Sequence, residues 1–260
     1  MNLPVPFRAA AFLLLAGIGC SARGPGPSTM APVTDDRCAA VHAGRVEQRQ
    51  RFGGISGSGS LRLYSAAGRG RASFDFTYRR PHSLRLEFRT PFGPAAAVLD
   101  IDGQRWLFAD FRQGLFVRGE GEGSFRRFTG LPAGPTALIP VLLAEPGAAD
   151  HGLYDLRFHP GTCLPLGCRI VVPGGGVAPI TVNYRWPEKP AGATDPPGFD
   201  LPERVVLIGP EVDRETVIRF KRVRPLEPAE LERVPEAVDI TGLEQAGPVV
   251  ESDGLPEWLR

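Results

Sequence analysis

Two neighbouring stretches of alternating apolar and polar residues decide the fold: RASFDFTYR at residues 71–79 and LRLEFR at residues 84–89. In each stretch every second residue is apolar, and the residues between are charged or carry a hydroxyl group. This period-two alternation is typical of a β-strand with one apolar and one solvated face. The two stretches therefore predict neighbouring strands of an antiparallel sheet.

Similar runs along the chain bring the expected number of strands to about eleven. The others are expected at residues 60–63, 95–101, 104–109, 114–118, 153–158, 168–172, 179–185, 203–209 and 215–223. Turn residues separate these runs, and the chain as a whole is rich in them, with 32 glycines and 27 prolines. One of these turns, Asp102-Gly103, suits a two-residue hairpin. A sheet of this size has to curl, and its apolar face needs a cover. The sequence thus predicts a mainly β fold built on one curled sheet.

Two helical segments are expected beside the sheet. Asp35 or Asp36 can cap an N-terminal helix that runs to about Gln50. Residues 131–145 are apolar on most sides, contain prolines and carry no charge before Glu145. They predict a short, Pro-interrupted helix that packs on the concave face of the sheet as a lid.

The N-terminal residues have the features of an export signal. Arg8 precedes an uncharged apolar stretch, residues 9–19, which is too short for a bilayer span of about 20 residues. The stretch ends in LAGIGC at residues 15–20, which resembles the lipobox of bacterial lipoproteins, with Gly17 where Leu is usual. The resemblance implies a signal peptide at residues 1–19 and acyl chains on Cys20.

The residues after this signal fit a membrane tether. Residues 20–34 are rich in Gly, Pro, Ser and Thr, so we interpret them as the lipidated cysteine followed by a flexible linker. Each methylene of an acyl chain that is buried in a bilayer contributes about 0.8 kcal/mol to membrane binding. Acyl chains on Cys20 would therefore hold the protein at a membrane. Ser21 follows the cysteine, whereas Asp in that place resembles an inner-membrane retention signal. These features favour the periplasmic face of the outer membrane.

Charge is distributed unevenly along the chain. Residues 226–260 hold nine acidic and two basic residues, a net charge of −7, and because the whole chain has +1, residues 1–225 carry +8. We interpret residues 226–260 as an acidic, Pro-rich and largely extended tail after a domain at residues 35–225. For the basic domain, a solvated surface and an attraction to anionic lipid headgroups both stay open.

Three further cysteines follow Cys20, and the periplasm is oxidising, so pairing is expected. Cys163 and Cys168 bracket a turn-like sequence and could close a small loop through a disulfide, which leaves Cys38 free or paired with another protein. A bridge from Cys38 to either of the others is the alternative.

No pattern of catalytic residues stands out. GISGSG at residues 54–59 lacks the spacing of a nucleophile elbow, because no serine there has glycine two residues before and two after it. We interpret it as a turn leading into a strand. The histidines lack metal-ligand spacing: His42, His82, His151 and His159. We expect a monomer that is not an enzyme and has no cofactor, no metal and no nucleic-acid partner.

Two segments resemble the LolB-type lipoprotein-localisation proteins: LRLEFRTPFGPAAAVL at residues 84–99, and residues 131–147, which end in LLAEPG. The resemblance implies an incomplete antiparallel β-barrel of eleven strands closed by helices. It further implies an apolar interior that takes the acyl chains of a lipoprotein from a soluble periplasmic carrier. Phe92 stands in the loop where that family exposes an apolar residue that touches the bilayer.

The apolar positions of the strands and the lid are the expected lining of such a cavity: Phe74, Phe76, Leu86, Phe88, Trp106, Phe108, Ile139 and Leu142. The expected function is to bind acyl chains of membrane lipids or lipoproteins, with insertion of lipoproteins into the outer membrane as the specific role. The alternative is a structural lipoprotein, in which the same side chains fill a solid core and the acidic tail binds a partner. The alternation of apolar residues along the strands is the same for a hollow interior and for a solid core, so it does not distinguish the two functions.

Overall fold

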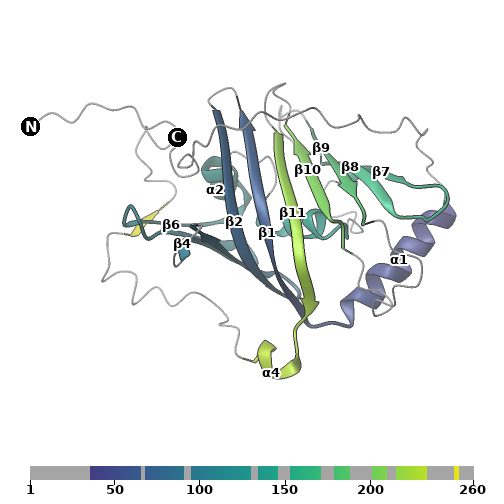
Figure 1. The fold of residues 1–260 in the computed structure, drawn as a ribbon, viewed down its shortest axis with the longest axis horizontal. Helices are drawn as coiled ribbons and strands as arrows, with labels where there is room; N and C mark the ends of the chain where they lie inside the picture. The colour runs from purple at the N-terminus through teal and green to yellow at the C-terminus, as the bar shows by residue number, and fades with distance from the viewer. Residues whose placement is uncertain are drawn as a thin grey trace, which may run out of the picture.

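The computed structural model describes residues 36–65, 68–90, 95–129, 134–145, 153–170, 179–187, 201–209, 215–232 and 249–251. One large sheet dominates this part of the chain (Figure 1). Eleven of its strands pair with one another, and each of these pairs is antiparallel. They are β1 (Gly54–Ser65), β2 (Gly68–Arg79), β3 (Ser83–Arg89), β4 (Ala95–Asp102), β5 (Arg105–Asp110), β6 (Leu115–Glu120), β7 (Leu153–Phe158), β8 (Pro165–Ile170), β9 (Ile180–Arg185), β10 (Arg204–Ile208) and β11 (Glu215–Pro225). The predicted mainly β fold, with eleven strands in an unclosed barrel, is confirmed.

Two meanders make up the sheet. Strands β1 to β6 follow one another in space as in sequence, and so do β7 to β11. The meanders join where β1 pairs with β11, for example through Leu61 and Ile218. Because β1 and β11 meet in the middle, β6 and β7 lie towards opposite ends of the sheet, and the chain has to cross its concave side to connect them.

Helices α2 (Gly121–Thr129) and α3 (Pro135–Leu142) belong to this crossover. Both contribute fully buried side chains to the main core, among them Phe125 from α2 and Val141 from α3. The predicted Pro-interrupted helix at residues 131–145 is thus confirmed as α3, with Pro135 near its start and Pro140 inside it. Helix α2 was not predicted from the sequence.

Helix α1 (Asp36–Gln50) matches the predicted N-terminal helix and lies beyond β7, at one end of the sheet (Figure 1). Its packing differs from the usual amphipathic pattern. The residues that α1 buries are Cys38, His42 and Arg49, whereas Val41 is 40% exposed. A disulfide, a ring contact and polar contacts of Arg49 therefore attach α1 to the domain.

Three local predictions need correction. Residues 54–59 are not a turn, because they form the first half of β1. Residues 165–167 are not a turn either, because β8 begins at Pro165 and places Cys168 inside a strand. The hairpin after β4 turns at Gly103 and Gln104, one residue later than predicted, since Asp102 still pairs with Arg105. Gly103 takes the positive φ of 60° that this turn requires.

The expectation of a largely extended tail needs correction at residues 228–231, which are helical, whereas residues 249–251 are extended. Leu226 is buried and donates its backbone N–H to the carbonyl of Gly54. The short helix α4 (Pro228–Leu231) follows, with a capping box between Glu227 and Glu230. Strand β12 (Val249–Glu251) adds to the edge of the sheet, in parallel with β6.

Candidate functional site: an apolar pocket beneath helix α3

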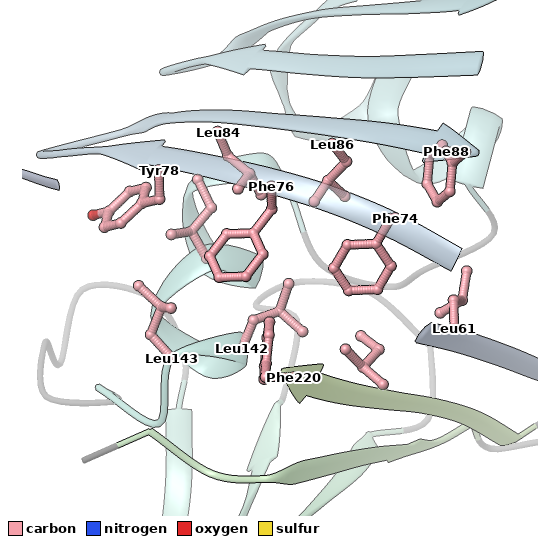
Figure 2. A pocket seen from close by; sticks show the side chains of 12 residues that line it. Leu61, Phe74, Phe76, Tyr78, Leu84, Leu86, Phe88, Leu142, Leu143 and Phe220 are labelled. Carbon is pink, nitrogen blue, oxygen red and sulfur yellow. The ribbon is translucent and has the colours of Figure 1, made fainter. Parts of the chain in front are cut away.

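An apolar pocket lies between the concave face of the sheet and α3 (Figure 2). Its lining comes from the middle of the sheet and from the lid: Leu61, Phe74, Phe76, Tyr78, Leu84, Leu86, Phe88, Ile139, Leu142, Leu143, Ile218 and Phe220. The one hydroxyl group among these side chains, on Tyr78, donates to the carbonyl of Pro81 at 2.7 Å. The surface offered to a ligand is therefore almost entirely hydrocarbon.

Strand register explains why these residues meet. Phe74 pairs with Phe88 and Phe76 with Leu86 across β2 and β3, so the alternate apolar positions of both strands share one face. Phe220 of β11 reaches the same space, with its ring centroid 5.4 Å from that of Phe76. In Figure 2, side chains of β2 and β3 point towards those of α3 and β11 across the pocket.

Two glycines of β1 make room for the phenyl rings. Gly57 pairs with Phe76 and Gly59 with Phe74. A Cβ atom on Gly59 would lie 2.4 Å from Cζ of Phe74 and 2.6 Å from the carbonyl oxygen of Arg219, closer than atoms can approach. Glycine at these positions lets the rings lie over β1, so the GISGSG stretch contributes packing space to the site.

The pocket is narrow in this structure. The space that the centre of a water molecule can reach is about 60 Å³, and all space between the lining atoms out to the open mouth is about 510 Å³. The smaller volume corresponds to roughly five water-sized groups. An acyl chain of full length would therefore need α3 and its side chains to move away from the sheet.

Polar contacts hold the C-terminal end of α3 to the domain. Tyr184 of β9 donates its hydroxyl to the carbonyl of Val141 at 2.8 Å, and burial raises the pKa of Tyr184 well above its usual value, so the donor is neutral at pH 7. Arg49 of α1 donates to the carbonyls of Leu143 and Ala144 at 2.9 and 3.1 Å. These bonds satisfy carbonyl groups that the end of a helix otherwise leaves without partners.

Glu145, directly after this end, forms ion pairs with two arginines. Both terminal nitrogens of Arg80 contact its carboxylate, at 2.9 and 2.7 Å. Arg49 Nε lies 3.6 Å from the same group. The side chain of Glu145 is only 7% exposed, so the lid ends in a buried ion-pair cluster.

Six of the eight predicted cavity residues line the pocket: Phe74, Phe76, Leu86, Phe88, Ile139 and Leu142. The placement of Trp106 and Phe108 in the cavity lining is corrected. Both lie on the concave face, but α2 covers that part, and the indole of Trp106 stacks on Phe128 at 4.8 Å. Trp106 also donates its N–H to Ser124 Oγ at 3.0 Å.

Two predicted sites fall outside the described residues. They are the lipid attachment at Cys20, with the signal peptide and tether around it, and the membrane-contact residue Phe92. Sequence reasoning in turn missed six pocket residues: Leu61, Tyr78, Leu84, Leu143, Ile218 and Phe220. Leu143 stands in the predicted lid and the other five in predicted strands.

The predicted pairing of Cys163 with Cys168 is wrong. Cys163 forms a disulfide with Cys38, the pairing that the sequence left as the alternative. Cys168 is a buried free thiol 3.6 Å from the hydroxyl of Tyr184, and burial raises its pKa. The physical reason is that β8 begins at Pro165, so Cys163 lies in the preceding turn beside α1, whereas Cys168 lies in the main core.

Within the described residues, no cluster of His, Cys, Asp or Glu could hold a metal ion. Nor does the part of the chain that the structure describes include a helix with the length and apolar character needed to cross a membrane.

No known protein family and no curated protein matches the sequence. Solved structures with a similar fold include a DUF1329 family protein from Desulfovibrio piger, with 11% identity, a TM-score of 0.51, and coverage of 75% of this chain and 96% of that one. An outer membrane lipoprotein-sorting protein domain from Vibrio parahaemolyticus has 10% identity and a TM-score of 0.47, covering 75% and 97%. A LolA superfamily protein from Nitrosomonas europaea has 8% identity and a TM-score of 0.46, covering 73% and 96%.

At such low identity the comparison concerns the fold. The curled half-barrel of this chain is shared with the Desulfovibrio protein over nearly the whole length of that protein.

Proposed function

We propose that the chain binds acyl chains of lipids or lipoproteins in the pocket beneath α3, at the periplasmic face of the outer membrane. The observation that carries this proposal is the chemistry of the lining: eleven side chains are hydrocarbon, and the twelfth has its hydroxyl hydrogen-bonded inside the protein. On an apolar surface of this kind, each buried methylene of a ligand contributes about 0.8 kcal/mol to the binding free energy. A polar ligand would find no hydrogen-bond partner among these side chains. The function is binding and transfer, without covalent chemistry.

The arrangement of α3 supports reversible loading. Its apolar side faces the pocket through Ile139 and Leu142, while its C-terminal end is held by Tyr184, Arg49 and Arg80. A lid of this kind can lift from the sheet when hydrocarbon from a ligand replaces its own side chains over Phe74 and Phe76. Insertion of lipoproteins into the outer membrane is the specific role we propose, with a soluble periplasmic carrier as donor and Cys20 as the anchor.

A fluorescent fatty acid tests the pocket directly. The chain without residues 1–20 retains every described residue, and we expect it to bind cis-parinaric acid with saturable fluorescence. Leu86→Glu, which places a charge on the half-buried pocket wall, should weaken binding by about tenfold or more, because burying an unpaired charge is costly. Ile208→Glu is the matched control, since Ile208 is 38% exposed and lies outside the pocket.

Leu86→Trp gives an independent measurement, because it fills the pocket without adding charge. We expect weaker binding than in the parent chain and a circular dichroism spectrum that does not change. Equal affinity for the fatty acid in the parent, Leu86→Glu and Leu86→Trp chains would refute the pocket as the acyl site. It would favour the alternative of a solid core.

A further inference from the structure

A second cavity lies between α1 and the start of β8, and none of the described residues that line it also lines the acyl pocket. Its polar wall comes from α1, through His42, Arg45, Gln48 and Arg49, and residues 164–165 and Trp186 complete it. The four α1 residues follow one another at helical spacing, so they share one side of the helix. The space that water can reach here is about 70 Å³.

The α1 wall contains buried donors that lack acceptors. His42 is 4% exposed, and within the described part of the chain neither of its ring nitrogens has a hydrogen-bond partner. The same is true of the buried Nη1 of Arg45. Because buried polar groups in folded proteins are almost always hydrogen-bonded, several unpaired groups around one cavity indicate a missing acceptor.

Charge points to the nature of that acceptor. Two arginines line the cavity, and none of the described residues that line it is acidic. Glu145 contacts both Arg49 and Arg80, so its single negative charge is shared between two arginines and leaves none for Arg45. Glu47 of the same helix is exposed and does not line the cavity. The described residues around the cavity therefore carry a net positive charge.

His42 fits the same interpretation. Burial, together with Arg49 and Arg45, lowers its pKa to about 4, so at pH 7 the ring is neutral and has one N–H to donate. Its ring also contacts Phe158 of β7, with 5.6 Å between centroids, which keeps it at the wall.

We propose that this cavity binds a phosphate group. A phosphate has acceptor oxygens in several directions, which suits a wall whose donors are a guanidinium, an imidazole and an amide. Its source is either the headgroup of a phospholipid or phosphate in solution, and the site functions independently of acyl binding.

Calorimetric titration of the full chain in a non-ionic detergent at pH 7, with chloride as the buffer anion, tests the site. We expect saturable binding of inorganic phosphate. Arg45→Gln should weaken it by about tenfold or more, because a charge-assisted hydrogen bond is lost. Gln48→Glu should weaken it as well by placing a carboxylate at the wall, and since Gln48 is exposed this variant tests the site even if Arg45→Gln fails to fold.

Arg51→Gln is the matched control, because it removes one positive charge from an exposed residue outside the cavity. It should bind phosphate within about twofold of the parent chain. Absence of saturable heat, as expected if water alone fills the cavity, would overturn the proposal. So would equal affinity in the parent, Arg45→Gln and Gln48→Glu chains.

Titration with glycerophosphoglycerol, the deacylated headgroup of phosphatidylglycerol, separates the two sources. Tighter binding of this diester than of inorganic phosphate identifies a lipid headgroup, and the reverse order identifies free phosphate. Leu86→Glu, which should impair the acyl pocket, is expected to keep full phosphate affinity, so failure of one proposal does not affect the other.

Discussion

Arg80 and Glu145 form a two-pronged ion pair, with Nη1 2.9 Å from Oε2 and Nη2 2.7 Å from Oε1, which joins the end of β2 to the residue that follows the lid helix. Glu145→Gln should lower the free energy of unfolding by about 2–4 kcal/mol, because it leaves two arginines near a neutral group in a poorly solvated place. Urea denaturation measures this loss.

The control for this prediction has the same geometry in a different environment. Glu230 accepts both terminal nitrogens of Arg224 at 2.7 Å, but this pair lies in solvent. Glu230→Gln should leave the urea midpoint nearly unchanged, since exposed ion pairs contribute little. Similar losses in the two variants would show that burial does not strengthen the Glu145 cluster.

His42 should make stability depend on pH in the acid range. Its pKa falls from 6.5 to about 4 in the folded chain, through burial first and then Arg49 and Arg45. In the unfolded chain His42 therefore binds a proton below about pH 6.5, whereas in the folded chain it binds one only below about pH 4. Because the unfolded chain binds more protons between these values, stability decreases as the pH falls from about 6.5 to about 4. The contribution is about 3 kcal/mol at most.

Urea denaturation at pH 7.5 and pH 4.5 measures the effect, with His42→Leu as the comparison. The difference in stability between the two pH values should be smaller in His42→Leu than in the parent chain. An equal difference in both chains would mean that His42 titrates normally.

Gly59→Ala should destabilise the chain by about 1–3 kcal/mol, because the added methyl group would overlap Phe74 and the backbone at Arg219. Displacement of the Phe74 ring should also weaken fatty-acid binding. Gly123→Ala in α2 is the control: its Cβ meets nothing within 4 Å, and alanine favours a helix. We expect Gly123→Ala to match or exceed the parent in urea, and a tolerated Gly59→Ala would contradict the close packing of Phe74 on β1.

Peptide mapping without reduction should recover Cys38 linked to Cys163, with Cys168 as a free thiol. A Cys38→Ser, Cys163→Ser double variant should lose about 2–5 kcal/mol, because the bridge closes a loop over a sequence separation of 125 residues. Recovery of a peptide that links Cys163 to Cys168 would contradict the structure.

Much of the fold could be predicted from local pattern. The alternation at Phe74, Phe76, Leu86 and Phe88 indicated both the strands and the side of the sheet that these residues occupy, because successive side chains of a strand point to opposite faces. The same logic placed Trp106 and Phe108 on the concave face correctly. It could not show that α2 covers them while α3 covers the pocket, because alternation carries no information about which segment lies above a strand.

By itself, then, the sequence determined the strands, their apolar face and the apolar character of the lid, since each depends on residues close together in the chain. The tertiary structure alone decided the pairing of β1 with β11, the partner of Cys38 and the placing of Gly59 beneath Phe74. The first two join residues more than a hundred positions apart, and the third depends on strand register. Such contacts follow from how the whole chain packs, which local periodicity does not encode.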